Sequence, residues 1–177
     1  MAKMTLYDLS RETLKPEDVE RFQEEILRGT DRASALVAAS LVEGALIRAL
    51  AAHMLIKDDE HFTELFFDRG AVLGDFASRI SMGRAFGVYD DYFRDVLDVI
   101  RKVRNTFAHA VRPIDFTHEL IAAQIAKIPD APVKEGLPHS MSELRRRYVG
   151  VCSNLEVVFI DHSRRFKTAF VVDLQKG

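Results

Sequence analysis

The sequence is poor in the residues that build disulfide frameworks, metal centres and phosphate-binding loops. It has one cysteine (Cys152), no tryptophan, nine glycines and five prolines among 177 residues. A single cysteine excludes a disulfide within the chain. The six histidines include no His-x-x-x-His pair, and there is no Cys-x-x-Cys, no Gly-x-Ser-x-Gly and no Gly-rich loop after a strand. The sequence therefore predicts no metal site and no cofactor.

Charge of one sign and long hydrophobic runs are also missing. The net charge is −2, which gives no general attraction to nucleic acid or to anionic membranes. We find no helix-turn-helix, so direct DNA binding is not expected. Met1 to Ser10 has no apolar core of signal-peptide length. The longest uncharged run of the apolar part, Ala33 to Val42, is too short to span a bilayer. We expect a cytoplasmic protein without a membrane partner.

What is present is a helical pattern throughout. At 47% hydrophobic and 29% charged residues, the composition is that of a globular domain long enough to bury a core. We predict one all-α domain over residues 1–177, a helical bundle of about six or seven helices. Capping residues, glycines and prolines place the expected boundaries. Helices are expected over about 16–29, 31–56, 58–67, 75–87, 90–109, 117–127 and 141–168, with a proline-rich loop over 128–140.

Three local signals refine these boundaries. Asp90 is expected to cap the helix that ends at His109. Ser140 and Glu143 are spaced as a capping box for the last helix. Phe170 to Val172 is the only strand-like run, and it is expected to be strand or tail.

The segment from Ala33 to Ala52 has few polar residues and predicts a nearly apolar, buried central helix. Glu43 lies in its middle, where a lone carboxylate would be costly. In the helix that starts at Asp90, Arg104 falls within the apolar stripe, four residues after Ile100. Because a buried guanidinium also needs a partner, we predict that Glu43 and Arg104 form an ion pair.

The end of that helix carries the residues with the most chemical potential. Asn105 and His109 are four apart and share a helix face, whereas Arg104 lies about 140° from His109 on an ideal helix. RNA cleavage without a metal needs an acid, a base and positive charge at the phosphate, and a dimer would supply His109 and Arg104 twice. The structural alternative is that Arg104 neutralises Glu43, Asn105 bonds a loop carbonyl, and His109 favours the negative helix end.

Several other residues have a structural interpretation beside a functional one. The Arg145–Arg147 run is expected to be a solvated face, although it could contact phosphates. His162 is expected to be a core-edge histidine, and Cys152 a packed apolar residue. His53 and His61 have no acidic or histidine neighbour at ligand spacing. The phenylalanines at 62, 66 and 67 are expected in the core, with a dimer contact as the alternative.

Three blocks, over residues 30–39, 72–80 and 100–109, together resemble the mannitol operon repressor family. The resemblance spans about residues 16–125 and keeps the order of the blocks. Arg104-Asn105-Thr106-Phe107-Ala108-His109 also resembles the Arg-x4-His signature of the HEPN superfamily, which includes dimeric RNases. The loop over 128–140 and the C-terminal helix lie outside the resemblance, so partner specificity is expected there.

The first resemblance implies an all-helical, non-enzymatic repressor that acts through another protein, and we expect the chain to form a homodimer. In that hypothesis a structural polar cluster fixes the helices; its members are Asp31, Arg32, Glu43, Arg79, Arg104 and His109. The second implies a metal-independent endoribonuclease, with Arg104 stabilising the phosphate, Asn105 orienting and His109 as general base. RNA would then be the partner, and His109 would have to be exposed.

Overall fold

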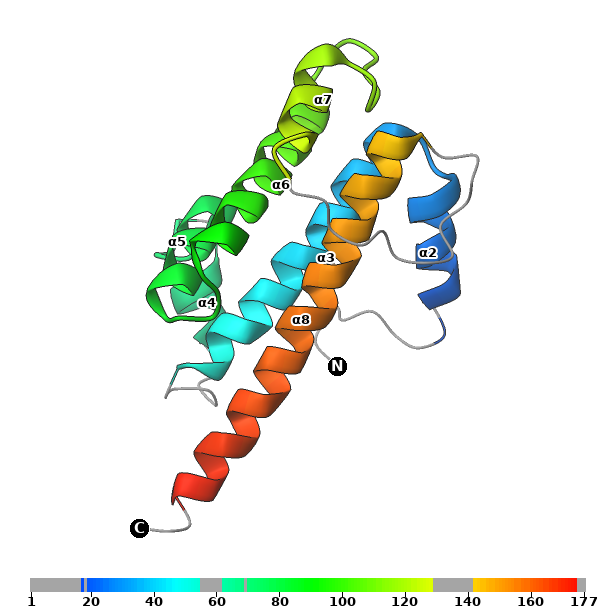
Figure 1. Cartoon of the computed structure of the whole chain (residues 1–177). Coiled ribbons are helices and arrows are strands. Elements are labelled where there is room, and N and C mark those ends of the chain that lie inside the picture. Colours follow the sequence, from blue (N-terminus) through cyan, green and yellow to red (C-terminus); the bar gives the residue numbers. More distant parts are fainter. Residues whose placement is uncertain (1–16, 18, 55–61, 69, 129–141, 175–177) are drawn as a thin grey trace, which may run out of the picture.

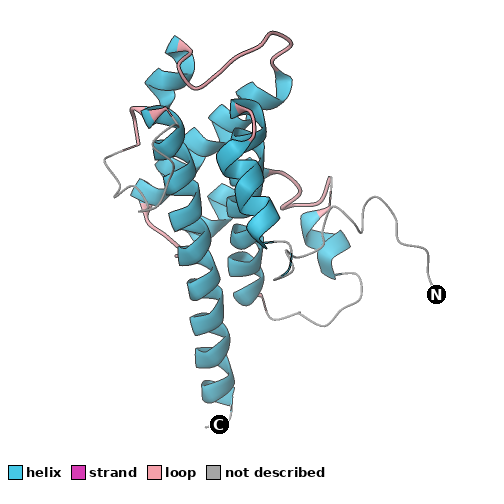
Figure 2. Cartoon of the chain, turned by 90° about the vertical axis from the view of Figure 1, so that its right-hand side faces the viewer, coloured by secondary structure: helices cyan, strands magenta, loops and turns pink. Residues whose placement is uncertain are grey.

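The computed structural model describes residues 17, 19–54, 62–68, 70–128 and 142–174, and these residues are helical with connecting turns. They contain no strand (Figure 2). The predicted all-α fold is therefore confirmed. The described helices are α2 (Val19–Arg28), α3 (Asp31–Ala52), α4 (Phe62–Phe67), α5 (Phe76–Ala85), α6 (Asp91–His109), α7 (Glu119–Ile125) and α8 (Glu143–Leu174), as Figure 1 shows.

Helix α3 is the central element of the bundle. It lies alongside α8 for most of its length, with α2 on one side and α5 and α6 on the other (Figure 1). Ten of its residues are buried, from Ser34 to Ala52, because small and apolar side chains occur on nearly every face. The predicted apolar central helix is confirmed. By length and composition alone α3 could also cross a membrane, and half of its most apolar window is buried inside the protein.

Three aromatic side chains pack α6, the turn before α7 and α8 against one another near the end of α6. The ring centroids of Phe107 and Phe116 are 5.0 Å apart, and those of Phe116 and Tyr148 are 5.4 Å apart. All three side chains are fully buried. Rings of this size dominate core energetics, so this group fixes where α6 ends relative to α3 and α8.

Thr30 and Asp90 cap the N-termini of α3 and α6, and Asp90 is the cap that the sequence predicts. Thr30 Oγ1 accepts from the Ala33 amide at 3.2 Å, and Asp90 Oδ1 accepts from the Phe93 amide at 3.1 Å. Each satisfies one of the orphan amides of a first helical turn. After α5, Gly87 adopts φ +69°, a conformation that favours glycine and ends the helix as expected.

The last helix extends beyond its predicted end. Its first described capping contact comes from Ser142, whose Oγ accepts from the Arg145 amide at 3.3 Å. The predicted cap Ser140, like most of the 128–140 loop, lies outside the described residues. At the other end α8 runs to Leu174, so the strand-like interpretation of 170–172 is wrong. A helix already formed gains one hydrogen bond for each added residue, which outweighs the weak local preference of β-branched residues.

Candidate functional site

Glu43, in the middle of α3, meets two arginines from two other helices. Its carboxylate oxygens lie 2.5 Å from Nη1 of Arg79 on α5 and 3.7 Å from Nη2 of Arg104 on α6. The exposed fraction is 18% for the Glu43 side chain, 8% for Arg79 and 35% for Arg104. The predicted Glu43–Arg104 contact is present, but Arg79 is the closer and more deeply buried partner.

Arg79 also binds the turn between α4 and α5. Its Nε donates to the Leu73 carbonyl at 2.6 Å, and its Nη2 donates to the carbonyls of Phe67 and Gly74, each at 3.1 Å. One planar guanidinium therefore joins this turn to the carboxylate of α3, using the several donors that only arginine supplies. This is a structural contact, because the donors are directed at the chain's own carbonyl groups.

The end of α6 does not bring Arg104 and His109 together within one chain. Arg104 Nη1 donates to Oδ1 of Asn105 at 3.0 Å. The helix continues through His109, so the angle of about 140° between Arg104 and His109 on an ideal helix is kept. His109 is exposed in the last turn. The nuclease hypothesis requires an exposed imidazole, which His109 has, but its convergence with Arg104 would need a second subunit.

The N-terminal turn of α3 holds two further members of the predicted polar cluster. Asp31 accepts from the Phe116 amide at 2.9 Å and lies 3.1 Å from Nη1 of Arg145. Arg32 Nη2 donates to the Ala110 carbonyl at 2.7 Å, just beyond the end of α6. The six residues thus lie in separate groups: Glu43, Arg79 and Arg104 together, Asp31 with α8, Arg32 beside the α6 end, and His109 at the surface.

The expectation that the Arg145–Arg147 run is a solvated face is wrong for Arg145. Only 11% of its side chain is exposed. Besides Asp31, it donates through Nη2 to the carbonyls of Ile26 and Gly29, at 3.0 and 2.8 Å. These carbonyls end α2 and have no partner within that helix, so a buried cation satisfies them and complements the negative end of the helix. Arg147 likewise donates to the Ile128 carbonyl.

A histidine pair, which sequence spacing could not reveal, joins α3 to α8. Nε2 of His53 lies 2.8 Å from Nε2 of His162, although the two residues are 109 apart in the sequence. Both rings are half-buried. The Phe166 ring stacks on His53 with centroids 3.9 Å apart. His162 was expected at the edge of the core, and burial lowers the pKa of its imidazole because the charged form loses hydration.

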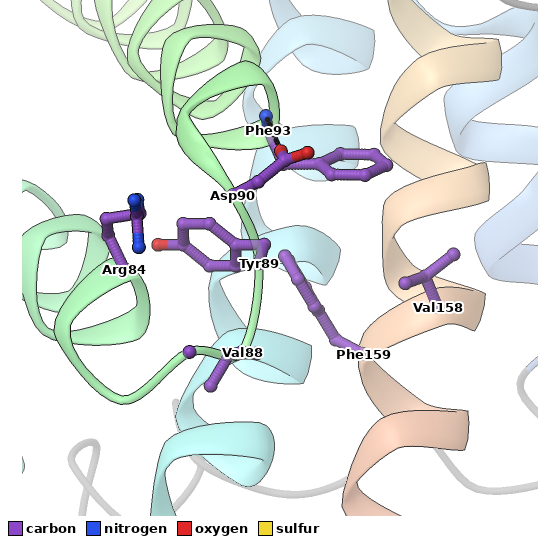
Figure 3. Close-up of a pocket in the computed structure, with 8 residues that line it drawn as sticks. Arg84, Val88, Tyr89, Asp90, Phe93, Val158 and Phe159 are labelled. Atoms are coloured by element: carbon purple, nitrogen blue, oxygen red, sulfur yellow. Dashed lines mark hydrogen bonds between the residues drawn. The ribbon is translucent and has the colours of Figure 1, made fainter.

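A shallow pocket of about 400 Å³ lies at the opposite end of α6 from His109 (Figure 3). It is formed by the turn between α5 and α6, the first turn of α6 and the outer face of α8. Val88, Phe93 and Val158 supply apolar walls, with Arg84 and Asp90 at the edge. Tyr89 is held by a hydrogen bond from its hydroxyl to the Ile80 carbonyl at 2.6 Å. None of the predicted site residues lines this pocket.

The described residues contain no group of three or more His, Cys, Asp or Glu side chains placed to hold a metal ion. Cys152 is fully buried, and burial raises the pKa of its thiol, so it is packed as an apolar residue. The strongest cluster on chemical grounds remains Glu43 with its two arginines. No family model, no curated protein and no solved structure matches this chain.

Proposed function

We propose that this chain is a non-enzymatic regulatory protein of the mannitol operon repressor type, which acts in the cytoplasm by binding another protein. The observation that carries the proposal is the use of the arginines in the resembling blocks. Arg32 donates to the Ala110 carbonyl at 2.7 Å, Arg79 donates to the Glu43 carboxylate at 2.5 Å, and Arg104 forms an ion pair with the same carboxylate at 3.7 Å. Groups committed to internal contacts are suited to fixing a binding scaffold rather than to turning over a substrate.

The partner class follows from charge. A net charge of −2 offers DNA no general attraction, so repression would need a DNA-binding partner. A homodimer is part of the proposal, as are the roles of the 128–140 loop and α8 in choosing the partner.

Transcription in the source organism tests this function. A strain lacking the gene is expected to show raised expression of mannitol-uptake genes, and the wild-type protein should restore repression. The His109→Ala variant should restore it equally, since His109 has no chemical role here. The purified protein alone should give no gel shift with the promoter at low salt. Unchanged transcripts in the deletion strain would reject the proposal.

The alternative is a metal-independent endoribonuclease of the HEPN type, which the exposure of His109 favours. His109 would act as the general base, Asn105 would be the orienting residue, and the guanidinium of Arg104 would stabilise the phosphate. A dimer would bring these groups together from its two subunits. The contact of Arg104 with Glu43 argues against it, because the carboxylate already takes up that positive charge.

Cleavage of a labelled RNA mixture in EDTA separates the two functions. Cutting by the wild-type protein and not by folded His109→Ala would establish the nuclease. No cutting by either protein would leave the arrangement at the α6 end as a structural feature, in line with the regulatory proposal.

A further inference from the structure

The solvent-facing side of α6 carries its charges in an ordered pattern. Six residues at alternating steps of four and three lie within about 80° of arc on an ideal helix. They form what we call the α6 stripe: Asp91, Asp95, Asp98, Lys102, Asn105 and His109. Its four charged side chains are 36–73% exposed, and the imidazole of His109 is also exposed. The first half of the stripe is therefore acidic, and the second half is basic or neutral.

The same division extends through the whole of α6 and the turn after it. Residues 90–98 contain four aspartates and one arginine, whereas residues 99–114 contain four arginines or lysines, one histidine and no acidic residue. The helix dipole favours such an order, but its effect is confined to the first and last turns. Asp98 and Lys102 lie in the middle of this helix of 19 residues, so the dipole does not account for their placement.

The aspartates of the stripe already have partners within the chain, and these leave them able to bind further cations. The carboxylate of Asp98 lies 2.6 Å from Lys102 and 2.6 Å from Arg101, and that of Asp95 lies 2.9 Å from Arg94. Exposed pairs of this kind contribute little to stability, because water and salt screen them. An ionised carboxylate has about four acceptor sites, so each aspartate can keep its present partner and accept from a second donor.

We propose that the α6 stripe is a homodimer interface, in which α6 of a second copy lies antiparallel on it. With the twofold axis at the level of Ile100, residues whose numbers sum to 200 face each other. The facing pairs are Asp91 with His109, Asp95 with Asn105 and Asp98 with Lys102. A parallel arrangement would instead place each aspartate against its own copy, and like charges in contact repel. The interface specifies the homodimer of the proposed regulatory function and rests on that part of it.

Two exposed apolar side chains fit the same arrangement. Tyr92, 44% exposed, lies at the start of α6, and Val111, fully exposed, lies just beyond its end. The helix is at the edge of the bundle, on the side of α3 away from α2 (Figure 1). Antiparallel pairing brings the start of one α6 beside the end of the other, so Tyr92 of each copy comes close to the level of Val111 of the other.

The size of the stripe sets the expected affinity, and its register sets what the dimer can do. A helix face about 28 Å long and 10 Å wide buries less than the roughly 1,200 Å² of a stable interface, so we expect a dissociation constant of about 10–100 µM. In this register His109 of one copy lies about 20 Å along the helix axis from Arg104 of the other. The dimer therefore does not assemble the shared site that the nuclease alternative needs.

Charge reversal with mixing, measured by sedimentation equilibrium, tests the interface. Asp95→Lys with Asp98→Lys makes both halves of the stripe basic, and Lys102→Glu with Asn105→Glu makes both halves acidic. Each double variant should self-associate at least about tenfold more weakly than the wild type, because like charges then face each other. An equimolar mixture of the two should form a heterodimer about as tight as the wild-type dimer, because both halves of the interface are complementary again. A general loss of stability cannot produce this recovery.

Two controls complete the test. Glu24→Lys with Glu25→Lys makes the same change in net charge at exposed residues of α2 and should leave self-association unchanged. The wild-type dimer should weaken about tenfold between about 0.05 and 0.5 M NaCl, a measurement that needs no variant. A wild-type protein that stays monomeric at about 500 µM, or a mixture of folded variants that stays monomeric, would overturn the interface. A dimer that both variants retain would also overturn it but would leave the regulatory function standing, because transcription tests that function separately.

Discussion

Arg79 and Arg104 face the same carboxylate, yet their surroundings predict different energetic roles. Arg79→Ala removes a nearly buried cation, leaves Glu43 with the distant Arg104, and strips a donor from three backbone carbonyls. Breaking a buried pair from one side typically costs about 3–5 kcal/mol. We expect a loss of this size in the free energy of unfolding, measured by urea denaturation with circular dichroism.

Arg104→Ala is the matched comparison, because Arg104 pairs with the same Glu43 carboxylate from a half-exposed position. With 35% of its side chain exposed and 3.7 Å to the carboxylate, the loss should be about 1 kcal/mol or less. The Arg79→Lys variant should recover only part of the loss, since an ammonium cannot reach the carbonyls in the same fork. Equal losses for the two alanine variants would contradict this prediction, because they would show that Arg104 matters as much to stability as Arg79.

Residues whose partners follow from helical spacing could be predicted, and those whose partners come from the far end of the chain could not. The Glu43–Arg104 contact follows from a lone carboxylate in the apolar α3 and from the helical period of α6, which places Arg104 in its apolar stripe. Arg145 and Asp31 are 114 residues apart, and a run of three arginines on a helix normally faces water. The histidine pair was missed for the same reason, because nothing in the local pattern says which two helix ends meet.

At the scale of elements, α2 packs against α3, and Arg145 on α8 adds a polar bridge to the end of α2. Arg145→Met keeps a long apolar stem but leaves the last carbonyls of α2 and the carboxylate of Asp31 without their cation. We expect a loss of about 3–5 kcal/mol, as for other half-removed buried pairs. Hydrogen exchange should show that amides of α2 lose protection before those of α3 do.

The next residue supplies the control for that experiment. Arg146→Met makes the same chemical change one position along α8, on a half-buried residue, and should change stability by no more than about 0.5 kcal/mol. If both variants behave alike, the loss reflects the charge of the α8 N-terminal turn and not the attachment of α2.

Helix boundaries, like side-chain contacts, could be predicted only where they depend on residues close by in the sequence. The starts of α3 and α6 could be predicted because capping is chemistry within one turn, as Thr30 and Asp90 show. The end of α8 could not, because cooperativity along a helix of 32 residues overrides the local preference of Phe170 to Val172. The all-α class was predictable since it rests on many such turns at once.

For the whole molecule, two buried tyrosines join the helices that form the core. The hydroxyl of Tyr148 on α8 donates to the carbonyls of Ala35 on α3 and Ile100 on α6, at 3.3 and 3.4 Å. The hydroxyl of Tyr89 donates to the Ile80 carbonyl of α5. Burial raises the pKa of both phenols, because a tyrosinate in the core would lose its hydration.

These raised pKa values predict alkaline unfolding. The contribution of each neutral phenol is complete below the unfolded-state pKa of about 10, and above it the unfolded chain releases protons that the folded chain retains. Stability should therefore fall by about 1.4 kcal/mol per pH unit for each tyrosine as pH rises above about 10. Tyrosinate absorbance from these two residues should appear together with the loss of helical circular dichroism, and Tyr89→Phe should make the fall less steep. Absorbance that rises fully while the helices remain intact would mean that water reaches the phenols in the folded core.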